Sequence, residues 1–194
     1  MAGKKRSEFK PDPQGAGFLS RLYVTRSQRL KVLKWALFSL VGLLLLVLQD
    51  VIFSRIHILD ATTDLVPGVL LLVCVLRGPE SGGMFTLAGA LVYYLSGSSP
   101  GAGVILVLTL LGMAAAAFRE SFLRKGFSSA LLCAGVALLL YEMIIFIMGL
   151  FLGLTIAPRV GVFALTGVLT VAATAALYPL LLAIDKIGGE TWKE

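Results

Sequence analysis

The stretch over residues 127–154, FSSALLCAGVALLLYEMIIFIMGLFLGL, decides the fold class of this chain. It holds one charged residue, Glu142, in 28 positions. About 20 predominantly apolar residues are enough for a helix to cross the hydrocarbon core of a bilayer, so the run predicts a transmembrane helix that tilts or protrudes. The whole chain agrees: 58% of its 194 residues are apolar and 14% are charged. Soluble domains are about a quarter charged.

Five further apolar segments lie along the chain, over residues 35–53, 64–76, 82–95, 101–118 and 160–184. The segments over 64–76 and 82–95 are short, and a re-entrant pair is the alternative to two full spans. We expect an all-α membrane protein with six transmembrane helices over residues 35–186. A basic cytoplasmic tail over residues 1–34 precedes this domain, and a short cytoplasmic tail over residues 187–194 follows it.

Basic residues are distributed unevenly around these segments. With six spans and a cytoplasmic N-terminus, fifteen of the 17 Lys and Arg residues lie on the cytoplasmic side, and only Arg55 and Arg159 lie outside. This asymmetry is what the positive-inside rule describes. We therefore expect a multi-pass protein of the bacterial cytoplasmic (inner) membrane, with both termini in the cytoplasm.

Nine of the basic residues precede the first apolar segment. A basic stretch beside a span typically sets topology and binds anionic headgroups, so we expect an interfacial helix over residues 18–34. Nucleic acid is not expected as a partner, because no aromatic residues are interleaved for base stacking. The candidate lipid-binding residues are Arg21, Arg26, Arg29, Lys31 and Lys34.

Enzyme signatures are missing from the sequence. It contains no HExxH, no GxSxG and no Walker A motif, and its one histidine, His57, lies in an outer connection with no nucleophile motif to serve. Cys74 and Cys133 lie inside apolar runs without a CxxC or Cys/His cluster, which favours packing over a disulfide or metal site. We predict a non-catalytic protein without a cofactor or metal.

Small and polar residues recur at helical spacing within the apolar segments. Close packing of small residues drives helix association in lipid, so these faces predict contacts between helices. One face comprises Gly82, Thr86, Gly89 and Tyr93, and another comprises Gly167, Thr170, Thr174 and Tyr178. The candidate helix-packing or partner face of the first and longest segments comprises Gly42, Asp50, Gly135, Glu142, Gly149 and Gly153.

Glu142 is the exceptional member of that face. An ionised carboxylate in the middle of a span is costly unless it is paired or faces water. Three interpretations stay open: a neutral, hydrogen-bonded packing residue, a partner for a cation, and a ligand or proton site. Asp50 and Asp64 flank the first outer connection, and we interpret both as solvated helix ends.

The stretch over residues 64–103, DLVPGVLLLVCVLRGPESGGMFTLAGALVYYLSGSSPGAG, resembles the MreD family of bacterial rod-shape-determining membrane proteins. Shared features are a short second span with a proline, a glycine-bearing turn, and a third helix that ends in Leu95-Ser96-Gly97. The endings Tyr178-Pro179-Leu180 and Ile184-Asp185-Lys186 are also similar. The resemblance covers most of residues 33–194. Many members carry an acid near the end of the third span, where this chain has Tyr93-Tyr94, so no role of that acid is carried over.

The resemblance implies a non-catalytic scaffold of the cell-elongation (rod) complex, which supports cell shape and peptidoglycan synthesis. The partners that it implies are an MreC-type bitopic shape protein, an MreB-type filament, and a SEDS polymerase with its transpeptidase. The architecture it implies is similar to the substrate-binding components of energy-coupling-factor transporters. The alternative function is therefore a small-molecule-binding subunit of a vitamin-type transporter, with Glu142, Tyr93 and Tyr94 lining a pocket. Short outer connections favour the scaffold.

Overall fold

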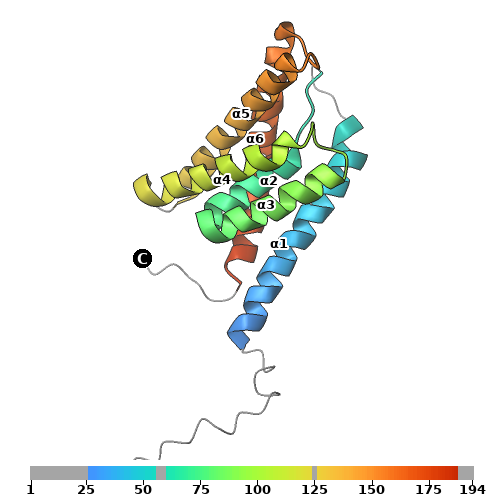
Figure 1. Cartoon of the computed structure of the whole chain (residues 1–194). Coiled ribbons are helices and arrows are strands. Elements are labelled where there is room, and N and C mark those ends of the chain that lie inside the picture. Colours follow the sequence, from blue (N-terminus) through green and yellow to red (C-terminus); the bar gives the residue numbers. More distant parts are fainter. Residues whose placement is uncertain (1–25, 56–59, 124–125, 188–194) are drawn as a thin grey trace, which may run out of the picture.

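The computed structural model describes residues 26–55, 60–123 and 126–187. Within these ranges the chain is helical and contains no strand (Figure 1). The α-helices are α1 (Arg26–Val51), α2 (Leu65–Arg77), α3 (Pro79–Leu95), α4 (Gly103–Phe122), α5 (Phe127–Phe151) and α6 (Val160–Asp185). Two short 3-10 helices, η3 (Phe53–Arg55) and η4 (Ala157–Arg159), follow α1 and precede α6.

Four helices in the described part of the chain are long and apolar enough to cross a membrane: Arg29–Val51, Gly103–Phe122, Phe127–Phe151 and Ala157–Asp185. Their outward faces stay apolar, with Leu44 61%, Leu110 59% and Leu132 59% exposed. Exposed apolar surface of this extent is typical of proteins that face lipid. The chain is thus an all-helical, multi-pass membrane protein, as the sequence predicts.

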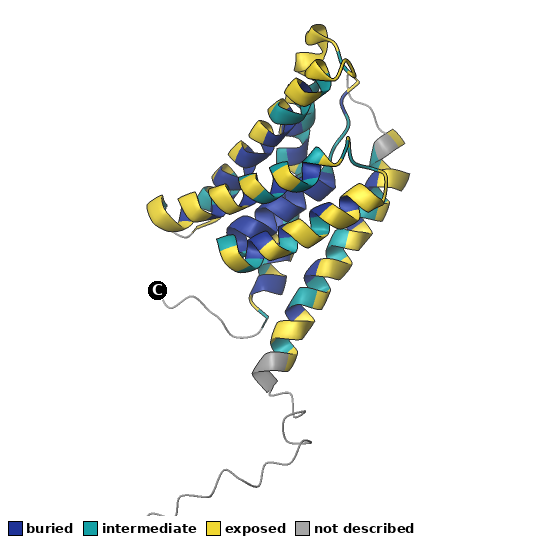
Figure 2. Ribbon diagram, viewed as in Figure 1, coloured by how far each residue is buried: buried dark blue, intermediate teal, exposed yellow. Residues whose placement is uncertain are grey.

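The shortest α-helix, α2, forms the centre of the bundle. Every residue from Leu65 to Leu76 is buried, and all five other α-helices pack against α2. Figure 2 shows α2 in dark blue, surrounded by helices whose outer faces are exposed. Its sequence is apolar on every side, as expected of a helix with no solvent-facing stripe. Pro67 lies in the first turn, where the missing N–H group has no helical partner to lose.

The following helix, α3, crosses α2 at backbone contact. Gly78, with φ of 89°, turns the chain sharply between the two helices. A Cβ atom on Gly82 would lie 2.6 Å from the Cα and O atoms of Cys74, so only glycine permits this approach. The one hydroxyl proton of Thr86 is shared between the Gly82 carbonyl at 2.9 Å and the Leu70 carbonyl at 3.1 Å. The predicted small-residue face of this segment is confirmed as a contact between helices.

The first helix joins two segments that the sequence analysis separates, an interfacial helix and the first span. α1 runs without interruption from Arg26, so the expected boundary after Lys34 falls inside a helix. Arg21 and the rest of the predicted interfacial segment before residue 26 lie outside the described residues. Arg29 and Lys31 are exposed at the start of α1.

The interpretation of Lys34 as a lipid-binding residue needs correction. Lys34 is 3% exposed, and its Nζ atom lies 3.3 Å from the Oδ1 atom of Asp185 at the end of α6. An ammonium group that is paired inside the bundle does not reach lipid headgroups. Its role is therefore to join the first and last helices.

Candidate functional site

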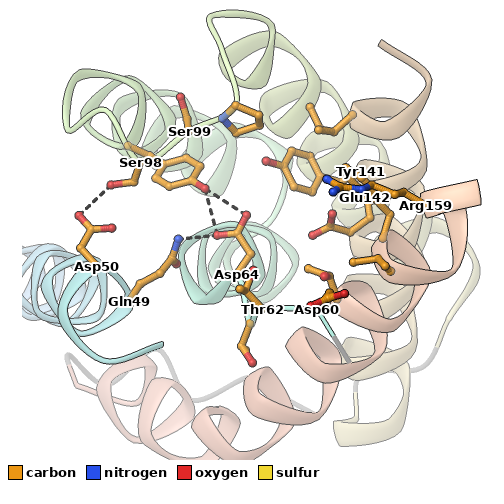
Figure 3. Close-up of a pocket in the computed structure, with 17 residues that line it drawn as sticks. Gln49, Asp50, Asp60, Thr62, Asp64, Ser98, Ser99, Tyr141, Glu142 and Arg159 are labelled. Atoms are coloured by element: carbon orange, nitrogen blue, oxygen red, sulfur yellow. Dashed lines mark hydrogen bonds between the residues drawn. The ribbon is translucent and has the colours of Figure 1, made fainter. Parts of the chain in front are cut away.

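A cavity of about 820 Å³ lies over the N-terminal end of α2 (Figure 3). The lengths of the helices account for it. The 13 residues of α2 rise about 20 Å, whereas the 25 residues of α5 and the 26 of α6 rise nearly twice as far. The long helices therefore continue past the first residue of α2 and enclose a space that α2 does not fill. The lining residues are Gln49, Asp50, Asp60, Thr62, Thr63, Asp64, Tyr93, Ser98, Ser99, Pro100, Tyr141, Glu142, Ile145, Arg159, Val162, Phe163 and Thr166.

Asp64, immediately before α2, forms the floor of this cavity. Its carboxylate accepts hydrogen bonds from Gln49 Nε2 at 2.7 Å and from the Tyr93 hydroxyl at 3.0 Å. Its backbone N–H donates to the Thr170 hydroxyl at 2.9 Å, and Gln49 Oε1 accepts from the Val66 N–H at 2.9 Å. Side chains from α1 and α6 thus satisfy backbone donors at the start of α2, which would otherwise lack partners.

This network corrects the expectation that Asp64 is a solvated helix end. Asp64 is half-buried at the cavity floor, and its carboxylate is bonded to α1 and α3, so it also joins helices. Asp50 fits the expectation better, because it is exposed, and it accepts a hydrogen bond from the Ser98 hydroxyl at 2.8 Å. Both residues stand at an end of the connection between α1 and α2, so their positions in the sequence do not reveal this difference in bonding.

Two buried side chains of α5 project toward the same space, as Figure 3 shows. Tyr141 is 1% exposed and Glu142 is 5% exposed. Within the described residues, the Tyr141 hydroxyl and Glu142 Oε1 have no hydrogen-bond partner. A buried polar group left unpaired costs about 1–3 kcal/mol, and a charged one costs more. Both residues line the cavity, so a polar molecule that reaches these atoms from there would remove this cost.

The charge of the cavity lining is predominantly negative. Asp50, Asp60, Asp64 and Glu142 contribute carboxyl groups, and Arg159 is the one basic residue in the lining. No three His, Cys, Asp or Glu side chains in the described ranges are grouped so that they could hold a metal ion. The electrostatic field of the cavity favours a cation over an anion.

The residues of the predicted α5 face divide between two environments. Gly135 and Glu142 are buried, as predicted, and a Cβ atom on Gly135 would lie 3.5 Å from Val171 of α6. Gly149 is half-buried next to Thr155. Gly153 is wrong as a packing residue: it lies beyond the end of α5, exposed, and its φ of 70° places it in a turn.

The predicted α6 face is confirmed as an internal one. All four of its residues, from Gly167 to Tyr178, are buried. A Cβ atom on Gly167 would lie 3.4 Å from Cγ of Glu142 and 2.9 Å from Leu139, so this glycine lets α6 approach α5 beside the cavity. Of the predicted aromatic pair, Tyr93 lines the cavity, whereas Tyr94 is 40% exposed and does not.

A second feature is an apolar groove between α1 and α3, which Gly42 lines. No atom lies within 4 Å of where its Cβ atom would stand, so no contact within the described chain requires a glycine there. The groove has a volume of about 180 Å³ and reaches down to α2. Its lining residues are Ser39, Gly42, Leu43, Leu46, Val66, Leu70, Phe85, Ala88, Gly89 and Val92.

An ion cluster that the sequence analysis did not predict lies at the opposite end of the bundle. Asp185 Oδ1 lies 3.3 Å from Lys34 Nζ and 3.1 Å from Arg77 Nη1, and the Arg77 guanidinium lies 5.4 Å from the Trp35 ring centroid. Nearby, Arg119 donates from Nη1 to the Val75 carbonyl at 2.8 Å. The sequence does place Lys34, Arg77 and Asp185 at the predicted cytoplasmic ends of three segments, which is the signal that could have indicated this cluster.

Comparison of the chain with protein-family models, with curated proteins and with solved structures gave no match. The resemblance to the MreD family therefore stays a prediction that rests on the residues quoted for it.

Proposed function

We propose that this chain is a non-catalytic membrane scaffold of the bacterial cell-elongation complex, which binds a transmembrane helix of a partner protein. The observation that carries the proposal is the groove between α1 and α3, where Gly42 has open space next to it. In lipid, a groove with small residues lets a second helix approach closely and gain packing contacts.

The walls of the groove favour a helix as the occupant. Ser39 and Gly42 on α1 and Ala88 and Gly89 on α3 are small, and Leu70 of α2 lies at the floor. Large side chains of a partner helix would insert into the space while the helix itself lies along α1, in the manner of knobs and holes. We expect a single apolar span of a bitopic MreC-type protein to be this partner. The MreB-type filament and the synthase pair would join through it.

The proposal includes six membrane-spanning helices. Four helices meet the length and hydropathy that crossing requires. α3, with 17 residues, rises about 26 Å, close to the hydrocarbon thickness of about 30 Å. α2 is shorter, but its complete enclosure by other helices removes the need to match the bilayer. With the basic asymmetry of the sequence, this topology places both termini in the cytoplasm and the cavity at the outer side of the inner membrane.

The experiment compares partner capture by groove variants. Gly42→Leu and Ala88→Leu fill the groove from each wall, and both positions lie on outward surfaces where the chain itself has room. The full chain is purified from bacterial membranes with a co-expressed MreC-type protein, and the amount of partner retained is measured. We expect each variant to lose most of the partner while its thermal stability in detergent stays close to that of the parent.

The matched control is a substitution at Ala114, which lines another apolar groove, between α4 and α5. Ala114→Leu adds the same side chain to a surface groove and should retain the partner. Retention by both Gly42→Leu and Ala88→Leu would refute the proposed docking site. Loss only in Ala114→Leu would place the partner at α4 and α5 instead.

A further inference from the structure

The cavity at the N-terminal end of α2 has features that partner capture by the α1–α3 groove does not use. It is separate from that groove in its residues, it is lined in part by charged and polar side chains, and two of its lining residues carry unpaired buried groups. A cavity of about 820 Å³ also falls within the size range of about 300–1,000 Å³ that is typical of small-molecule sites. These features indicate a ligand other than the partner helix.

We propose that this cavity binds a small organic molecule through a primary or secondary ammonium group, with Glu142 as its counter-ion and Tyr141 as a second acceptor. The inference does not depend on the proposed scaffold function. It follows from the two unpaired atoms, which belong to adjacent residues of α5 that both line this cavity (Figure 3).

The hydrogen-bonding capacity of the site selects a donor as ligand. A carboxylate oxygen can only accept hydrogen bonds, and a tyrosine hydroxyl can accept one as well as donate one. Asp64 already receives donors from Gln49 and Tyr93, so it adds negative charge without needing the ligand's protons. A quaternary ammonium group has no N–H to give to Glu142 Oε1, which favours primary and secondary amines.

The remaining lining indicates what the rest of the ligand resembles. Ile145, Val162 and Phe163 present apolar surface from α5 and α6, and Pro100 adds to it from the connection before α4. Such walls suit an apolar or aromatic body attached to the ammonium group. The rings of Tyr141 and Phe163 also provide faces that attract a cation.

An ammonium group of this kind has two natural sources, a soluble amine and the headgroup of phosphatidylethanolamine. Both would use the same two acceptors, because both present a primary ammonium group. The bilayer around the purified protein can therefore be chosen to separate them. Phosphatidylglycerol carries no amine and serves as the reference lipid.

The experiment measures thermal unfolding of the full chain in phosphatidylglycerol nanodiscs with a panel of arylalkyl primary amines. Phenethylamine and its neutral analogue 2-phenylethanol form the central pair. We expect the amines to raise the unfolding temperature in a saturable manner and the alcohol to have little effect. Glu142→Gln should weaken amine binding about tenfold to a hundredfold, as removal of a charged hydrogen-bond partner does. Tyr141→Phe should weaken it by a smaller factor.

Two controls keep the outcome interpretable. Tyr141→Phe removes a hydroxyl that bonds to nothing in the described chain, so it should fold normally even if Glu142→Gln does not. Glu80→Gln removes an exposed carboxylate at the start of α3, outside the cavity lining, and should change amine binding by less than about threefold. Equal effects of amine and alcohol, undiminished amine binding in both α5 variants, or no response to any amine of the panel would overturn the proposal.

Nanodiscs that contain phosphatidylethanolamine then identify the source. If the lipid is the ligand, they raise the unfolding temperature of the parent and reduce the effect of added amine, and Glu142→Gln abolishes both changes. If a soluble amine is the ligand, its effect persists unchanged in these discs. Either result supports an ammonium site.

Discussion

Asp185→Asn should be among the most damaging conservative substitutions in this chain. One oxygen of Asp185 lies 3.3 Å from Lys34 Nζ and 3.1 Å from Arg77 Nη1, and the side chains of Asp185 and Lys34 are 8% and 4% exposed. The amide keeps the shape of the carboxylate but leaves two cations facing each other inside the bundle. Breaking a buried ion pair on one side costs roughly 3–5 kcal/mol, or more than a hundredfold in the ratio of folded to unfolded chain.

Lys34→Met provides the matched comparison. Asp185 keeps Arg77 as its partner, so the cluster changes from two cations and one anion to a balanced pair. Methionine retains the apolar stem that packs in the bundle and needs no desolvation of a charge. We therefore expect Lys34→Met to cost about 1 kcal/mol. The double variant Lys34→Met/Asp185→Asn should be more stable than Asp185→Asn alone, since it removes the buried Lys34 ammonium group that Asp185 no longer pairs.

The assay is unfolding of the purified chain in mixed micelles, monitored by the fluorescence of Trp35 in a Trp192→Phe background; the Trp35 ring lies 5.4 Å from the Arg77 guanidinium. The four proteins form a double-mutant cycle, with an expected coupling of about 0.5–3 kcal/mol. An Asp185→Asn variant within about 0.5 kcal/mol of the parent would refute the reasoning, because that is the usual range of surface substitutions. Equal losses in the two single variants would refute the charge balance.

Three further predictions follow from the packing and topology. Gly82→Ala should cost about 1–3 kcal/mol in the same unfolding assay, because its Cβ atom would lie 2.6 Å from the backbone of α2, whereas Gly42→Ala meets no atom within 4 Å and should stay near the parent. Equal stability of the two variants would argue against the close crossing of α2 and α3. In a cysteine-free background, Ser98→Cys should react with an impermeant thiol reagent added outside intact cells; reaction only after lysis would invert the topology. Replacing Arg29 and Lys31 together by Gln should weaken cosedimentation of the purified chain with anionic vesicles, by about 1 kcal/mol for each residue at low salt. Unchanged binding would exclude these exposed residues as the lipid contact.

Much of the helical architecture follows from hydropathy alone. In lipid every backbone polar group needs an internal partner, so long apolar runs are obliged to be helical. The prediction over residues 127–154 corresponds to α5 at Phe127–Phe151, and that over 160–184 corresponds to α6 at Val160–Asp185. The division at residue 35 between an interfacial helix and the first span is wrong, because the helix continues through the basic residues as one element from Arg26 to Val51.

The small-residue faces were also predictable, since helical spacing places Gly82 and Thr86 on one side of a helix whatever the neighbours are. The same reasoning placed Glu142 inside the protein, where it is 5% exposed. It erred at Gly153, because the end of a helix depends on the turn that follows.

Only the tertiary structure decided which residues meet. Hydropathy is a property of one segment, whereas pairing depends on neighbours that are distant in sequence: Lys34 and Asp185 are separated by 151 positions, and Asp64 and Thr170 by 106. The central place of α2, and the cavity that its short length leaves above it, likewise depend on five other helices that pack around it. The sequence by itself therefore determined that this chain is a set of membrane helices with internal polar residues. The packing of those helices decided that Lys34 is paired inside the bundle, that Asp64 is bonded to two helices, and that Glu142 faces an acidic cavity.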